Sequence, residues 1–278
     1  MLRRSIAHFI RAAFAKLPRL VHACAMSDPK LPAAAAPPAW RTSLDFQSQA
    51  ADQYQDSVLT PLFDLMAREP ARVLELGCAT GAFGAELKRR HPRASVVGID
   101  AGHAAGARAA QRLDQVIVAQ LDDFDFAGAG FKPGEFDTVI AADILEHLRN
   151  PWALLERLKP CVAKDAQLMV SIPNVRNATV GVQLLASGEW KYAERGLLDV
   201  THLRFFTLAS MREMFEQTGY VVEAQRPLMM PQLEPMYEGA VKKGLVALRF
   251  GRITIADVTP QEAMELCAQQ FLLRVRPA

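Results

Sequence analysis

The chain has 278 residues, which is long enough for one sizeable hydrophobic core or for one domain with additions. Half of the residues are hydrophobic and 22% are charged, an ordinary balance for a soluble globular protein. The formal net charge is +2, so the composition gives no reason to expect a nucleic-acid partner.

The cysteines bear on metal binding and on location. Cys24, Cys78, Cys161 and Cys267 lie far apart, and no two of them form a CxxC pair. This spacing argues against a zinc site or a disulfide framework and fits a reducing compartment, so we expect a cytoplasmic location. No apolar run approaches the roughly 20 residues that a membrane-spanning helix needs.

The first 40 residues are predicted to form a separate segment. Apolar residues recur at helical spacing over residues 2–17, arginines fall on the other side, and Pro18 ends the pattern. Three interpretations remain open: this basic amphipathic helix contacts a membrane surface, it directs the chain to an organelle, or translation starts at Met26. Residues 28–40 are rich in proline and alanine and are predicted to be a linker.

From Trp40 onward, strand-like and helix-like segments alternate, a pattern that predicts a parallel sheet with crossover helices. Strands are predicted at residues 71–77, 95–100, 115–120, 136–145, 166–174, 220–225 and 269–277. Helices are predicted at about 46–67, 82–91, 101–113, from Pro151 onward, and at about 207–218 with an end at Gly219. Residues 174–200 are expected to be irregular. The predicted fold class is α/β, with a mostly parallel seven-stranded sheet and helices on both faces, formed by residues 41–278.

The most informative segment is the loop that follows the first strand. Gly77 and Gly81 stand just past that strand, where the absence of a Cβ lets the backbone turn sharply and approach a ligand. The helix that begins there offers unpaired N–H groups to a polar ligand. The spacing is G-x-x-x-G rather than G-x-G-x-x-G, and Glu75 lies two residues before the first glycine. Because this carboxylate would repel a pyrophosphate, a ligand with a cationic amino group and a sulfonium is favoured.

The run LELGCATG resembles the first motif of class I S-adenosylmethionine-dependent methyltransferases, a family with a Rossmann-like fold. It departs from the family pattern at one place, where Ala79 replaces the middle glycine, and we expect only a modest change in loop geometry. The resemblance implies S-adenosyl-L-methionine as the cofactor. It places cofactor contacts at Glu75, Gly77, Cys78, Ala79 and Gly81.

Further cofactor contacts are expected at the ends of the next strands. Asp100 ends the second strand, and its two carboxylate oxygens can accept hydrogen bonds from both ribose hydroxyls of an adenosine. The resemblance assigns additional contacts to Ala101, Leu121, Asp122 and Asp143. A solvated turn is the alternative for Asp122, because Gln120 stands where relatives commonly carry aspartate. The resemblance places Asp143 beneath the methionine portion of the cofactor.

The second half of the chain resembles a narrower group. The segments LEHLRNPW, SIPNVRN, GEWKY and GLLDVTHLRFFT look like those of a bacterial methyltransferase group found with sugar-modifying and glycan-assembly enzymes. The resemblance implies a small-molecule acceptor, and we expect a sugar or glycan-precursor hydroxyl, with O-methyl transfer favoured over N-methyl transfer. Two insertions, at about 174–204 and 228–262, are expected on the acceptor side.

An acceptor hydroxyl must lose a proton, and two histidines are candidates for the base. His147 directly follows the fourth strand, where open α/β sheets bind ligands, and His202 lies at the end of the first insertion. For each of them, a structural role as a packed and hydrogen-bonded histidine remains open. Glu146 and His147 are adjacent and make a poor pair of metal ligands, so no metal site is predicted.

Trp190, Tyr192 and Arg204 are the candidates for acceptor binding. Aromatic faces suit sugars and other rings, and the tryptophan and tyrosine lie in the segment expected to be irregular. Phe205 or Phe206 is expected to belong to the core. The positive charge of Arg204 would suit a phosphate or carboxylate on the acceptor, and a solvated surface position is the alternative.

Three other functions remain open at this point. Methylation of a protein side chain or of a quinone-like aromatic would require an acidic or aromatic acceptor pocket. An NAD-dependent oxidoreductase is disfavoured by Glu75 and by the missing G-x-G-x-x-G. A non-catalytic partner of another transferase would keep the fold without the activity, and the presence of Gly77, Gly81 and Asp100 weighs against it.

Overall fold

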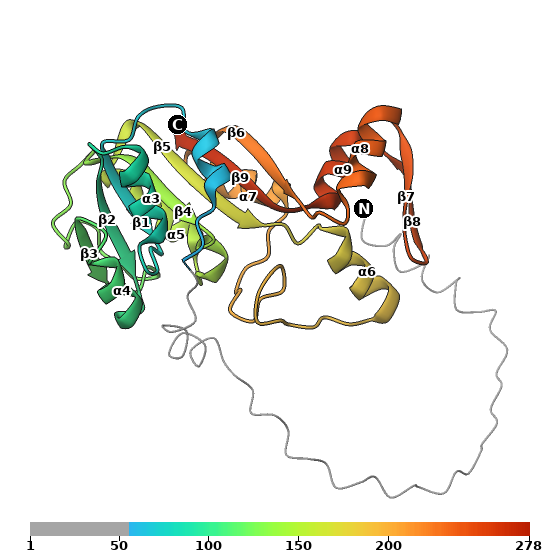
Figure 1. The fold of residues 1–278 in the computed structure, drawn as a ribbon, viewed down its shortest axis with the longest axis horizontal. Coiled ribbons are helices and arrows are strands. Elements are labelled where there is room, and N and C mark those ends of the chain that lie inside the picture. Colours follow the sequence, from blue (N-terminus) through green and yellow to red (C-terminus); the bar gives the residue numbers. More distant parts are fainter. Residues whose placement is uncertain (1–55) are drawn as a thin grey trace, which may run out of the picture. The chain divides into compact units, whose positions relative to one another are not determined.

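The computed structural model describes residues 56–278 (Figure 1). The amphipathic segment at residues 2–17, the linker and the possible start at Met26 lie outside the described residues. None of the helices between residues 56 and 278 is long and apolar enough to cross a membrane.

Seven strands form one sheet in the order β3-β2-β1-β4-β5-β9-β6. They are β1 (Arg72–Leu76), β2 (Ser95–Asp100), β3 (Gln115–Val118), β4 (Phe136–Ala142), β5 (Val162–Pro173), β6 (Tyr220–Met229) and β9 (Ala268–Pro277). The pairs from β3 to β5 are parallel, whereas β9 runs antiparallel to both β5 and β6. The predicted α/β class with a mostly parallel seven-stranded sheet is confirmed.

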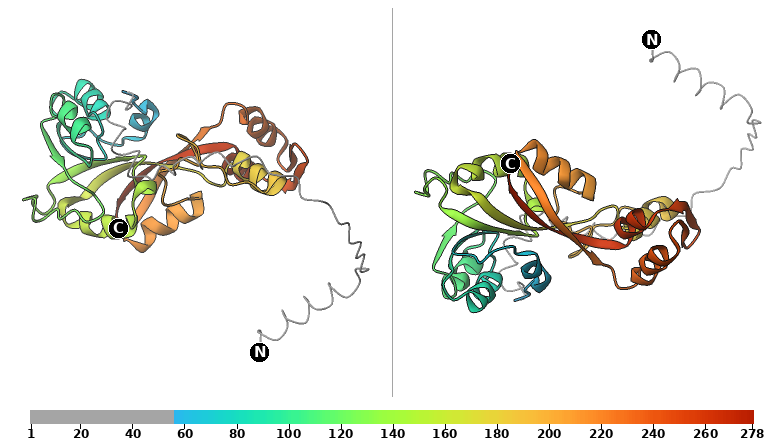
Figure 2. Two further views of the ribbon diagram at one scale, coloured as in Figure 1. Left: turned by 90° about the horizontal axis from the view of Figure 1, so that it is seen from below. Right: turned by 90° about the horizontal axis from the view of Figure 1, so that it is seen from above.

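Helices cover both faces of this sheet. Successive side chains of a strand point to opposite faces, and apolar side chains on both faces pack against helices. The covering helices are α3 (Ala82–Arg90), α4 (His103–Ala109), α5 (Pro151–Leu158) and α7 (Leu208–Gln217). Val73 packs in one apolar cluster with Phe83 and Leu87 of α3, whereas Leu74 packs in another with side chains of α5 and α7. Figure 2 shows α3 (teal) and α7 (orange) on opposite sides of the sheet.

The helix predicted at residues 46–67 is wrong over its described part. Residues 60–65 form only a short 3-10 helix, η2 (Thr60–Leu65), and a bend to extended backbone follows at Met66. Pro61 lies at the start of η2. A proline is tolerated there but lacks an N–H and clashes with the preceding turn, so a continuous α-helix through this position is disfavoured.

Residues 174–200 are not irregular throughout, because they contain α6 (Ala178–Ser187). The Asn177 side chain caps the helix by accepting a hydrogen bond from the N–H of Thr179 at 3.0 Å. Gly188 ends it in the left-handed conformation with φ of +66°. Both cap residues are visible in the sequence and were the missed signal.

The second predicted insertion is also folded. It comprises α8 (Glu234–Lys243), a hairpin of β7 (Val246–Phe250) and β8 (Ile253–Val258), and α9 (Pro260–Cys267). Apolar side chains of α6, α8, the hairpin and α9 form a third cluster, which includes Ala178, Ala240 and Leu248. The two insertions therefore share one small core, although 46 residues of sequence (188–233) separate α6 from α8.

The carboxyl ends of the parallel strands meet at one edge of the sheet, which is where open α/β sheets bind ligands. Leu76, Asp100, Ala142 and Pro173 end β1, β2, β4 and β5. These strand ends and the loops that follow them hold most of the candidates for cofactor or catalytic contact discussed below. Of the others, Glu75 lies within β1, Leu121 and Asp122 follow β3, and the rest come from the first insertion and β9.

Candidate functional site

The loop between β1 and α3 has an unusual backbone. Gly77, Ala79 and Gly81 all have left-handed φ angles, of +70°, +46° and +75°. The N–H groups of Gly77 and Cys78 donate to the carbonyl of Ile99 at 2.8 and 3.1 Å, which ties the loop to the end of β2. Glycine is needed at position 77, because a Cβ there would lie 2.7 Å from the Ile144 side chain.

Ala79 keeps the geometry that a glycine would adopt. Its left-handed φ shows that the loop follows the glycine-type path despite the methyl group. For an L-residue this conformation costs roughly 1–2 kcal/mol. The loop is therefore held by contacts outside residue 79 itself.

Asp100 provides one of these contacts. Its Oδ2 atom accepts a hydrogen bond from the N–H of Ala79 at 2.8 Å, and its Oδ1 atom accepts one from the N–H of Gly102, also at 2.8 Å. Each carboxylate oxygen has a second lone pair, so both remain able to accept from ribose hydroxyls. The side chain that would bind a ribose thus also fixes the glycine-containing loop.

Glu75 lies beneath the start of α3. Its side chain is buried, and its Oε2 atom has no hydrogen-bond partner among the described residues. A Cβ on residue 84 would lie 2.5 Å from this oxygen, so only Gly84 leaves room for the carboxylate. Burial raises the pKa of Glu75 to about 8, and the negative charge of Asp100 adds to the effect. A nearby cation would stabilise the charged form of Glu75.

The residues predicted to contact adenine are buried or already hydrogen-bonded to other parts of the protein. Leu121 is buried in the core, and Asp122 accepts hydrogen bonds from the N–H groups of Arg149 and Asn150 at 2.8 and 3.4 Å. The Cys78 side chain is also buried, with its sulfur against Gly98, which leaves its backbone for contact with a ligand. Ala101 directly follows Asp100 and is half-buried.

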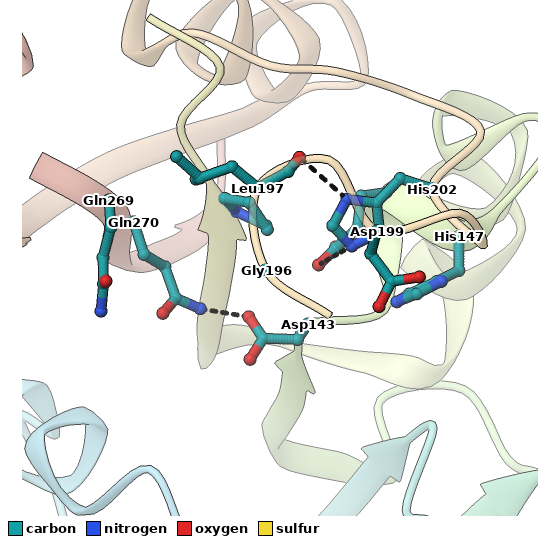
Figure 3. Close-up of a pocket in the computed structure, with 10 residues that line it drawn as sticks. Asp143, His147, Gly196, Leu197, Asp199, His202, Gln269 and Gln270 are labelled. Carbon is teal, nitrogen blue, oxygen red and sulfur yellow. Dashed lines mark hydrogen bonds and ion pairs between the residues drawn. The ribbon is translucent and has the colours of Figure 1, made fainter. Parts of the chain in front are cut away.

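A cavity of about 280 Å³ opens beside the ends of β4 and β5 (Figure 3). Its lining residues come from the loop after β4, the end of β5, the first insertion and β9: Asp143, Glu146, His147, Pro173, Gly196, Leu197, Asp199, His202, Gln269 and Gln270. Both predicted catalytic histidines and Asp143 are therefore brought together.

Asp143 stands where β4 ends and has a left-handed φ of +51°. Its carboxylate accepts hydrogen bonds from the Ser171 hydroxyl at 2.8 Å and from the Gln270 side-chain amide. Burial raises the pKa of Asp143, whereas the hydrogen bonds from Ser171 and Gln270 and the nearby His147 act to lower it. Figure 3 shows the bond between Gln270 and Asp143 across the cavity.

The first insertion brings His202 to His147. The carbonyl of Glu146 accepts hydrogen bonds from the N–H groups of Leu203 and Arg204 at 2.8 and 3.0 Å, which attaches the insertion to the 3-10 helix η3 (Leu145–His147). The two imidazole rings meet edge to face, with centroids 4.8 Å apart. Burial lowers the pKa of both histidines, so both rings are neutral near pH 7.

Hydrogen bonds fix the tautomer of each histidine. The Thr201 hydroxyl donates to Asp199 at 2.7 Å and therefore accepts from Nδ1 of His147 at 3.0 Å. Nδ1 of His202 donates to the carbonyl of Leu197 at 3.4 Å. Nε2 of each ring consequently carries an unshared lone pair.

The predicted acceptor-binding residues do not line this cavity. Trp190 and Tyr192 are partly exposed and contact the ring of Phe205, with centroid distances of 5.2 and 6.5 Å. Phe205 in turn faces His202 at 6.2 Å. The guanidinium of Arg204 donates to the carbonyl of Arg149. Of the two phenylalanines, Phe206 is the buried one.

Several lining residues were not predicted. Asp199 lies inside the motif GLLDVTHLRFFT, so its acid was a usable signal. Gln269 and Gln270 carry no such signal, because only the antiparallel register of β9 against β5 places them beside the end of β5.

Comparison with known proteins identifies the family of this chain. Residues 46–225 match the family described as a methyltransferase domain, which is more than half of the chain. A trans-aconitate 2-methyltransferase of Methylobacterium nodulans is 31% identical over 51% of this chain and 56% of that protein. A ubiquinone biosynthesis O-methyltransferase of Aeromonas salmonicida is 28% identical over 54% of this chain and 63% of that protein. The chain thus spans less than two-thirds of either relative.

A solved structure supports the fold. The SAM-dependent methyltransferase of Archaeoglobus fulgidus covers 85% of this chain and 95% of its own, with a TM-score of 0.52. Its sequence identity is 13%, so this similarity concerns the fold alone.

Replacement of Ala79 by glycine should stabilise the protein. Glycine removes the steric cost of the left-handed φ but gains freedom in the unfolded chain, so we expect the free energy of unfolding to rise by about 0.5–1 kcal/mol. Ala85→Gly, inside α3, is the matched control and should lower it by about 0.5–1 kcal/mol. Urea denaturation measures both. A decrease for Ala79→Gly as large as that for Ala85→Gly would show that residue 79 is not strained.

Burial of Glu75 should make stability depend on pH. Between about pH 4.5 and pH 8 the folded protein keeps the Glu75 proton that the unfolded chain has lost, so stability falls as pH rises. The slope is at most about 1.4 kcal/mol per pH unit. Glu75→Gln should lack this contribution when both proteins are unfolded in urea at pH 5, 6, 7 and 8.

Glu86→Gln is the control for this comparison. Hydrogen bonds from Arg89 and Arg90 lower the pKa of Glu86 to about 2, so its titration lies below the window. Parallel stability curves for wild type and Glu75→Gln would contradict the assigned pKa.

Proposed function

Because this chain belongs to the methyltransferase domain family, we propose that it transfers a methyl group from S-adenosylmethionine to a hydroxyl of a small, uncharged acceptor such as a sugar. Family membership confirms the predicted class of methyltransferase and, with it, S-adenosylmethionine as the cofactor. When bound, this donor supplies a methyl group on a sulfonium, which is already activated for displacement. The protein has to bind the donor, orient the acceptor and remove a proton.

The residues of the glycine-containing loop fit this donor. The left-handed turn from Gly77 to Gly81 brings backbone close to a ligand without a Cβ, and Asp100 offers lone pairs for two ribose hydroxyls. The unpartnered carboxylate of Glu75 lies beneath the loop and favours a cation nearby. The negative charge of Glu75 would repel a pyrophosphate, which supports the methyl donor over NAD.

The observation that supports a hydroxyl acceptor is the lining of the cavity. Its ten residues include three carboxylates, two amides and two neutral imidazoles, and no lysine or arginine is among them. Hydroxyl groups donate well to carboxylate and amide oxygens. An acceptor with several carboxylates, such as trans-aconitate, would meet like charge there.

The lining of the cavity also argues against a quinone-like acceptor and against N-methyl transfer. Phenylalanine, tyrosine and tryptophan are missing from the ten lining residues, which disfavours a large aromatic ring such as a quinone. O-methyl transfer is favoured over N-methyl transfer, because the carboxylates and Nε2 atoms can take up a hydroxyl proton. The name of the Aeromonas relative specifies O-methyl transfer for that protein.

We assign the base to Nε2 of His147. Its lone pair is unshared because Nδ1 donates to Thr201, and its neutral state at pH 7 suits a proton acceptor. Asp199 holds the Thr201 hydroxyl and thereby the orientation of the ring. His202 packs against His147 and positions it, and its role in acceptor binding is part of this proposal.

Methyl transfer should be tested with labelled donor and three acceptors: a neutral monosaccharide, a catechol and trans-aconitate. We expect the monosaccharide to be methylated fastest, because it offers hydroxyls to the carboxylates and amides without the aromatic ring of the catechol or the carboxylates of trans-aconitate. The product should resist mild base, as an ether does. A base-labile ester formed preferentially on trans-aconitate would contradict the proposal.

Two histidine variants test the base with whichever acceptor is methylated. His147→Ala should lower kcat by about 10²- to 10⁴-fold and leave donor affinity unchanged, whereas His202→Ala should mainly raise KM. His103→Ala, which alters an exposed histidine, is the control. Normal turnover by His147→Ala would exclude this base, and a loss of kcat confined to His202→Ala would move the role to the second ring.

A further inference from the structure

We propose that Glu146, His147 and His202 bind one divalent transition-metal ion at the cavity. One ligand atom from each of these residues lies within 4.8 Å of the other two. The sequence predicted no metal, because Glu146 and His147 alone are adjacent and form a poor pair. The first insertion supplies the third ligand, and with it the geometry of a metal site.

Glu146 carries the first observation. Its side chain is 1% exposed, and neither carboxylate oxygen has a hydrogen-bond partner among the described residues. A buried charge without a partner is strongly disfavoured, so such a group takes up a proton or binds a cation. A metal ion would give both free oxygens a partner.

The histidines carry the second observation. Histidines that bind metals usually donate their other ring N–H to a carbonyl, carboxylate or hydroxyl, which fixes the tautomer. Nδ1 of His147 has such a partner in Thr201, and Nδ1 of His202 has one in the carbonyl of Leu197. Asp199 holds Thr201 in turn. Both free Nε2 atoms are therefore prepared as ligands.

The ligand atoms must move closer together to share one ion. Nε2 of His202 lies 4.0 Å from Oε1 of Glu146. Ligand atoms that share one ion at bond lengths of about 2.0–2.2 Å lie roughly 3–3.5 Å apart, so these two atoms must approach by about 0.5–1 Å. The other pairs of ligand atoms lie within 4.8 Å of each other, so they must approach by up to about 1–2 Å.

The donor set selects the metal. Two imidazoles and one carboxylate suit Zn²⁺, Mn²⁺, Fe²⁺ or Co²⁺, whereas Mg²⁺ and Ca²⁺ prefer oxygen ligands. Three protein ligands leave at least one position open toward the cavity. If the proposed function is right, that position faces the acceptor oxygen. Nε2 of His147 is held by the ion in the metal-bound protein, so it acts as the proton acceptor only in the metal-free protein.

Titration of the full, untagged chain with metal alone tests the site. After treatment with a chelator, calorimetry should show one Zn²⁺ or Co²⁺ ion bound per chain and much weaker binding of Mg²⁺. Bound Co²⁺ should give the visible absorption of a four- or five-coordinate ion. Glu146→Gln and His202→Ala should each weaken binding at least 10-fold and remove the absorption, while His103→Ala should bind as wild type does.

A second readout guards against misfolded variants. Zn²⁺ should raise the Tm of the wild type, and it should leave the Tm of a folded Glu146→Gln or His202→Ala variant unchanged. Wild-type affinity in both variants, or no saturable binding by the wild type, would overturn the site. Because the titration contains neither donor nor acceptor, its outcome does not depend on the proposed function.

Discussion

The hydrogen bond from the N–H of Ala79 to Asp100 is the interaction on which the candidate site depends. It joins the loop after β1 to the end of β2 and holds residue 79 in a left-handed conformation that an alanine does not favour. The same carboxylate lies where a ribose is expected. One acid therefore holds the glycine-containing loop and, in the function we propose, also contacts the methyl donor.

A comparable arrangement stands at the end of β4. Asp143 also has a left-handed φ, and hydrogen bonds from Ser171 and Gln270 hold its side chain. Among the described residues, Ala79, Asp143 and Asp257 are the non-glycine positions with positive φ. Ala79 and Asp143 follow β1 and β4 at the carboxyl edge of the sheet, so two of these three strained positions lie at the glycine-containing loop and at the cavity.

Local patterns in the sequence predicted most of the sheet and the glycine-containing loop. The strand ends, the glycines and Asp100 are short-range features, since each depends on a few neighbouring residues. The cavity depends instead on long-range placement. His202 reaches His147 because the insertion bonds to the carbonyl of Glu146, and Gln270 reaches Asp143 because of the register of β9. No spacing in the sequence encodes either contact.

The binding of S-adenosylmethionine to Asp100→Asn, measured by calorimetry, tests the role of this carboxylate most directly. The charged hydrogen bonds that the substitution weakens are worth about 1.5–3 kcal/mol each, so we expect an affinity about 10- to 100-fold below that of the wild type. Asp114→Asn is the control, because Asp114 likewise accepts from a backbone N–H, that of Val96, but lies outside the loop. Equal donor affinity for wild type and Asp100→Asn would contradict the account.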